Sequence, residues 1–150
     1  MQAHLEQRVR ARQIIAVTHL FPHDPTAHEI ERIARKAMLG LPLEFQRTLD
    51  EIVLQVEEFA DRETLEKMGI ASRWQLIGLY QGIPLTERSI GMTGRFPDRI
   101  RLFRQPLLAD WRSRPGETLE RVVAHVLIHE VGHHFGLSDG DMYGLEDEPE

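Results

Sequence analysis

Residues 119–139 read LERVVAHVLIHEVGHHFGLSD and carry a helical pattern. Apolar side chains recur at spacings of three and four residues and form one stripe, made of Leu119, Val122, Val123, Val126 and Leu127. The pattern starts near Glu117 and runs to Phe135, and Gly136 then suits the left-handed conformation that ends many helices. The sequence therefore predicts an amphipathic helix over residues 117–135.

Three histidines share one face of this predicted helix. His125, His129 and His133 are four residues apart, a step of about 400°, so their side chains lie within about 80° of arc. A tetrahedral metal ion can be held by two imidazoles from adjacent turns, and His129 and His133 supply such a pair. Glu130 points about 100° away from His129, beside the metal, where it can take a proton from a metal-activated water. We predict His129 and His133 as metal ligands and Glu130 as the catalytic base.

Asp139 is the predicted third metal ligand. If the helix continued, Asp139 would lie about 240° round the axis from His133, on the wrong side. A glycine at position 136 allows the chain to reverse, so that Asp139 can return to the metal. The chain contains no cysteine, which leaves histidine and carboxylate as its zinc ligands. The predicted site is Zn²⁺ held by His129, His133 and Asp139, with a fourth position open.

The spacing of these residues is more specific than the histidines alone. A shuffled chain of this composition shows H-E-x-x-H with a probability of roughly 0.04, and Gly136 and Asp139 at their offsets multiply it by roughly 0.004. Chance is therefore a poor explanation. The structural alternative is that the histidines cap or solvate a helix end, where positive charge suits the helix dipole.

Length and charge exclude several classes of protein. A chain of 150 residues is expected to form a single core. The net charge of −6 and the scattered basic residues argue against a nucleic-acid surface. No apolar run approaches the length of a membrane span, and the first residues lack the cleavage site of a secretion signal, so we expect a cytoplasmic protein. The predicted organisation is an N-terminal extension over residues 1–25, a domain over 26–145 and an acidic tail over 146–150.

The remaining elements alternate between helix and strand and predict an α+β fold. Thr26 and Glu29 form a capping box for a helix that reaches Leu41, and Asp61 caps another helix that Gly69 ends. Short helices are predicted for residues 42–49 and 106–111. Strands are predicted for residues 52–59, 74–80 and 100–103, with residues 89–93 as a candidate partner of the last strand.

Three stretches together resemble the small bacterial zincin-like metallopeptidases: GLYQGIPLTERSI, FPDRIRLFRQPLL and VVAHVLIHEVGHHFGLSD. The resemblance covers about residues 26–143. It implies a minimal zincin-like fold, in which a small twisted mixed sheet packs against helices that include the HExxH active-site helix. It also implies zinc-dependent hydrolysis of a peptide or protein substrate, with His129, His133 and Asp139 as ligands and Glu130 as general base.

Three questions stay open at the level of sequence. Only eleven residues follow Asp139, which leaves a non-catalytic zinc-binding or peptide-binding module as the alternative function. Glu130 favours hydrolysis, because structural zinc sites usually close with a fourth protein ligand. Candidates to stabilise the oxyanion are Tyr143 and His125. Candidate edge strands for a bound peptide are Ile100 to Phe103 and Ser89 to Thr93.

Overall fold

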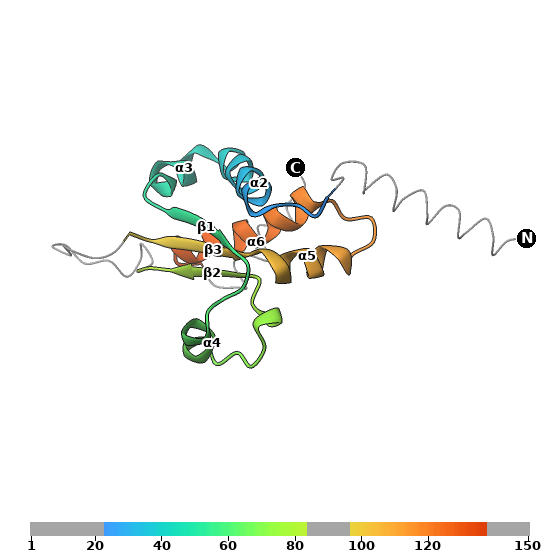
Figure 1. Ribbon diagram of the computed structural model, residues 1–150. Coiled ribbons are helices and arrows are strands. Elements are labelled where there is room, and N and C mark those ends of the chain that lie inside the picture. Colours follow the sequence, from blue (N-terminus) through green and yellow to red (C-terminus); the bar gives the residue numbers. More distant parts are fainter. Residues whose placement is uncertain (1–22, 84–96, 138–150) are drawn as a thin grey trace, which may run out of the picture.

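The computed structural model describes residues 23–83 and 97–137 (Figure 1). Within these ranges the fold is built on a mixed sheet with the strand order β1-β3-β2. Its strands are β1 (Val53–Glu57), β2 (Gly78–Gln81) and β3 (Arg99–Phe103). Strand β3 pairs in parallel with β1 and antiparallel with β2. The sheet and its helices confirm the α+β class and the minimal zincin-like fold.

The central position of β3 overturns one prediction. Residues Ile100 to Phe103 have a paired strand on both sides, so their backbone cannot accept an added peptide strand. Among the described strands, β1 and β2 form the two edges of the sheet. The other candidate edge, Ser89 to Thr93, lies outside the described residues.

The helices begin and end within two residues of the predicted positions. Helix α2 (Ala27–Leu39) starts with the predicted capping box: Glu29 N donates to Thr26 Oγ1 at 3.1 Å, and Thr26 N donates to Glu29 Oε2 at 2.6 Å. The side chain of Asp61 accepts from Thr64 N at the start of α4, and Gly69 ends that helix with φ of 68°. The other helical elements are α3 (Leu43–Leu49), α4 (Arg62–Met68), the 3₁₀ turn η1 (Arg73–Gln75), α5 (Arg104–Arg112) and α6 (Leu119–His134).

The second strand is shorter than predicted. Residues 74–80 are apolar enough for a strand, but Ser72 Oγ accepts a hydrogen bond from Trp74 N and residues 73–75 turn in η1. Strand β2 therefore begins only at Gly78. A hydrogen bond from the backbone of Trp74 to the side chain of Ser72 thus favours the turn over extended structure.

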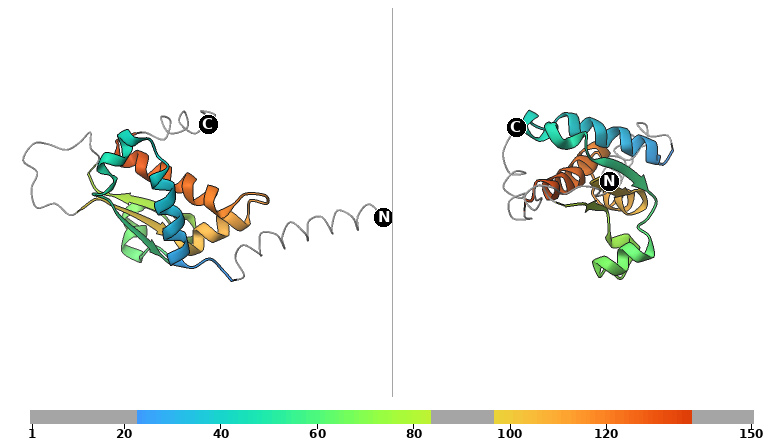
Figure 2. Two further views of the ribbon diagram at one scale, coloured as in Figure 1. Left: turned by 90° about the horizontal axis from the view of Figure 1, so that it is seen from above. Right: turned by 90° about the vertical axis from the view of Figure 1, so that its left-hand side faces the viewer.

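The sheet separates two layers of helix (Figures 1 and 2). Alternate residues of a strand point to opposite faces, so Ile100 and Leu102 meet α2 and α6, whereas Arg101 and Phe103 face α4. The larger core lies on the α6 side and contains Ile30, Ala34, Leu54, Leu107, Leu119, Val123 and Leu127. The smaller cluster on the α4 side is Ala60, Leu76, Leu79 and Phe103. Across the described parts of the chain, we find no helix of the length and apolarity that a membrane span needs.

Candidate active site

Helix α6 brings three of the predicted site residues to one cleft. His129, Glu130 and His133 line a cleft of about 520 Å³ between α6 and β2. The imidazoles of His129 and His133 come from adjacent turns, with ring centroids 4.9 Å apart and ring planes at 83°. The other residues that line the cleft are Met68, Gly78, Leu79, Tyr80, Gly82, Gly136 and Leu137. The arrangement offers two imidazoles and one carboxylate to a single space.

Glycine at position 78 allows β2 to approach α6 beside the carboxylate. A Cβ atom at Gly78 would lie 2.8 Å from Cγ1 of Val126 and 3.4 Å from Cγ of Glu130. The first distance is shorter than real Cβ contacts, so a larger residue would force the strand and the helix apart. Glu130 is only 8% exposed, which places its carboxylate at the inner side of the cleft.

The end of α6 matches the prediction for Gly136. Its φ is 75°, Gly136 N donates to the carbonyl of His133 at 3.0 Å, and Leu137 N donates to the carbonyl of Gly132 at 2.9 Å. This pair of bonds is the glycine-terminated helix end in which the chain leaves the helix axis. Asp139 lies outside the described residues, so its role as third ligand stays a prediction. Over residues 23–83 and 97–137, no group of three histidine or acidic side chains is placed to hold a metal.

One of the two oxyanion candidates, His125, does not line this cleft. His125 is exposed and lines a separate cavity of about 190 Å³, together with Asp110, Arg114, Glu117 and Arg121. Its position, two turns of α6 before His133, places it beyond the cleft that the other two histidines share. Tyr143 falls outside the described residues.

The comparison with known families agrees with this geometry. Residues 49–148 match the family model of the zincin-like metallopeptidases. The chain belongs to this family. The matched segment contains the whole described sheet and α6, whereas α2, which packs against α6, precedes it in this zincin-like chain. No curated protein matches the chain.

The donor set of the zincin-like cleft fits a zinc ion. Imidazole nitrogen is among the ligands that zinc prefers, and neighbouring turns of one helix bring the rings of His129 and His133 together. Both rings are partly exposed at the cleft, so an ion can reach them. The family is one of metal-dependent enzymes, and these two residues are the described side chains that suit that metal.

Sequence reasoning missed the part that β2 takes in the cleft. Gly78, Tyr80 and Gly82 line the cleft opposite the histidines, in a segment that was assigned only as a strand and a loop. Two glycines that flank a tyrosine at this spacing are a signal of close backbone approach. His134, which follows the second histidine of the motif, is fully buried and contacts Asp98 and Tyr80.

Proposed function

We propose that the protein is a zinc-dependent peptidase whose active site is the cleft between α6 and β2. One observation supports this most directly: two imidazoles and a buried carboxylate, spaced as H-E-x-x-H, meet in the same cleft of a zincin-like metallopeptidase. Glu130 follows His129 directly and points about 100° away from it, so its carboxylate belongs to the site without taking the place of a histidine ligand.

His129, His133 and Asp139 would hold the zinc ion. When bound, zinc supplies a Lewis acid that polarises the scissile carbonyl and makes water more acidic. The ligand imidazoles must be neutral, so we expect metal affinity to fall as the pH drops below the ordinary histidine pKa of about 6.5.

Glu130 acts as the general base. Its carboxylate accepts a proton from the attacking water, and the resulting carboxylic acid then donates that proton to the leaving amine. The low exposure of Glu130 limits competing contact with bulk water. The peptide bond gains one water overall, and Glu130 ends the cycle ionised as it began.

The edge strand β2 is the surface on which we place an extended peptide. It forms one border of the described sheet, and its residues Gly78 to Tyr80 line the cleft together with His129 and His133. A peptide added to a sheet edge is held by its main chain, so such a site accepts many sequences. The substrate class that follows is an extended, unfolded segment of peptide or protein.

Metal content tests the proposal first. After dialysis without chelator, elemental mass spectrometry is expected to find about one zinc per chain in the wild type. His129→Ala and Asp139→Ala are expected to lose most of it, whereas the matched control His125→Ala retains it because that residue lies outside the cleft.

Three results would change the assignment. A wild type without zinc would remove the proposed function, and full zinc in Asp139→Ala would remove the third ligand. Retained zinc with no hydrolysis of any peptide in a broad library would favour the peptide-binding module over the enzyme.

A further inference from the structure

A polar cluster extends from the wall of the cleft into the core and has no part in the proposed reaction. It consists of Tyr80, Asp98 and His134. Nδ1 of His134 lies 2.8 Å from Oδ2 of Asp98 and 3.2 Å from the hydroxyl of Tyr80. His134 is 0% exposed and Asp98 is 2% exposed, so both polar groups are removed from water. Such groups are retained in an interior only with partners.

The cluster joins three separate elements of the fold. Tyr80 comes from β2, Asp98 directly precedes β3, and His134 is the last residue of α6. The backbone carbonyl of Asp98 accepts a hydrogen bond from Val53 N at 2.8 Å, which fixes it to the start of β1 as well. A Cβ atom at Gly82 would collide with the carboxylate of Asp98. The backbone after β2 therefore closes over this carboxylate.

Both contacts of the cluster meet the same ring nitrogen. A carboxylate accepts hydrogen bonds, so the 2.8 Å contact with Asp98 favours the tautomer of His134 that carries a proton on Nδ1. The hydroxyl of Tyr80 reaches the same edge of the ring. The cluster thus holds the imidazole by one edge and sets its orientation.

The position of His134 on α6 links its contact with Asp98 to the orientation of His133 in the cleft. Neighbouring residues of a helix point about 100° apart, so His133 lines the cleft while His134 enters the core. Any rotation of the last turn that moves His133 also withdraws His134 from Asp98. That movement would leave buried polar groups without partners, which is strongly unfavourable.

We propose that Tyr80, Asp98 and His134 are positioning residues, which set the direction of the His133 imidazole and tie it to the cleft strand β2. The effect on zinc rests on the proposed function. The orientation of His133 in the metal-free protein does not depend on it.

The test compares variants that remove one polar group each. Tyr80→Phe and Asp98→Asn alter the cluster, and Thr64→Val is the matched control, because it removes a buried hydroxyl on the opposite face of the sheet. Three quantities are measured on each full-length protein: the imidazole NMR resonances of His129 and His133 without metal, the Kd for zinc, and the melting temperature.

We expect the cluster variants to shift the His133 resonances before metal is added. The zinc Kd is expected to rise by about 10-fold in Asp98→Asn, the range for partners behind a metal ligand, and by about threefold in Tyr80→Phe. Thr64→Val is expected to lower the melting temperature without changing the resonances or the Kd.

Each result separates the two proposals. Lower melting temperatures with unchanged His133 resonances in both cluster variants would overturn the positioning role and leave a packing role. Shifted resonances in a protein that binds no zinc would support positioning while removing the zinc function. If Asp98→Asn does not fold, Tyr80→Phe decides the question, because it removes only a hydroxyl.

Discussion

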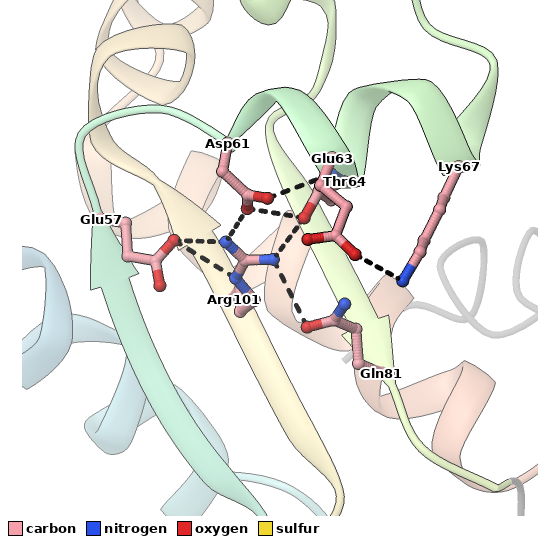
Figure 3. A network of polar contacts seen from close by, with 7 residues as sticks. All are labelled: Glu57, Asp61, Glu63, Thr64, Lys67, Gln81 and Arg101. Atoms are coloured by element: carbon pink, nitrogen blue, oxygen red, sulfur yellow. Dashed lines mark hydrogen bonds and ion pairs between the residues drawn. The ribbon is translucent and has the colours of Figure 1, made fainter.

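Two polar clusters lie on opposite faces of the same three-stranded sheet. On the α4 face, the guanidinium of Arg101 donates to Glu57 at 2.6 Å, to Asp61 at 2.8 Å and to Thr64 at 3.0 Å (Figure 3). On the α6 face, Asp98 and His134 lie behind the candidate active site. The first cluster joins β1, β3 and α4, and the second joins β2, β3 and α6.

The two clusters differ in what surrounds them. The side chain of Arg101 is 8% exposed, but its partners Glu57 and Asp61 are 36% and 53% exposed and face water themselves. Neither of the two described cavities is lined by Arg101. The α6 face instead opens into the cleft of His129, Glu130 and His133. A buried charge therefore does not by itself mark a cleft in this fold, whereas His129, Glu130 and His133 share one.

The charges of the Arg101 cluster favour a structural role, in which the cluster holds β1, β3 and α4 together. Hydrogen bonds from Thr64 and then from Arg101 hold the pKa of Asp61 well below its usual range. Burial opposes the charge of Arg101, but its contacts with Glu57 and Asp61 outweigh this and raise the pKa of the guanidinium. Both shifts favour the charged forms of these groups.

Replacing a glutamate by glutamine on each face of the sheet should give the largest difference, which is in peptide hydrolysis. Glu130→Gln is expected to lower kcat/KM for peptide hydrolysis by about 10²- to 10⁴-fold, because the general base is lost, with zinc content unchanged. Glu57→Gln is the control on the α4 face and should stay within about twofold of wild type. A fluorogenic peptide library supplies the assay. Equal activity of Glu130→Gln and Glu57→Gln would remove the functional difference between the two faces.

Removal of Arg101 should affect stability rather than the cleft. Arg101→Leu leaves Glu57, Asp61 and Thr64 without their shared donor, and we expect a loss of about 2 kcal/mol in the free energy of unfolding. The loss is smaller than for a fully buried pair, because the two carboxylates can return to water. Urea denaturation measures the change, and zinc titration at 25 °C serves as the control. A higher Kd for zinc in Arg101→Leu would show that the two faces of the sheet are coupled.

The smallest expected effect is on the dependence of stability on pH. The pKa of Asp61 is lowered in the folded state, so its contribution to stability is present above the unfolded value of about 4 and is lost as the pH falls below it. Asp61→Asn keeps a side-chain oxygen for the helix cap but cannot titrate. Its melting temperature should therefore fall less steeply than that of wild type between about pH 4 and pH 2. Parallel profiles would exclude Asp61 as a source of the acid sensitivity.

Local signals predicted the helices well because each acts over a few residues. The caps at Thr26 and Asp61 and the glycine ends at Gly69 and Gly136 bond within one turn of their own helix. The helical period likewise brought His129, Glu130 and His133 to one cleft. Their chemical roles remain predictions.

Local sequence patterns did not predict the contacts between distant segments. The order of the strands, and with it the central place of β3, depends on pairings that no periodicity describes. Arg101 reads as one polar residue in an apolar strand, and its partners on β1 and at the start of α4 lie 37 to 44 residues earlier. His134 looks like a third histidine of the motif, but its burial depends on Asp98 and Tyr80, which other segments supply.

The contact between Tyr80 and His134 spans 54 residues of sequence and bears on how the molecule folds. A helix such as α6 can form from neighbours along the chain, but closing so long a loop is slow and waits for the sheet. The spacing of the paired histidines therefore depends on local structure, whereas the cleft between them and β2 depends on a long-range contact. Because β2 precedes α6 in the chain, synthesis delivers the strand wall first, and the cleft is complete only when α6 docks on the sheet.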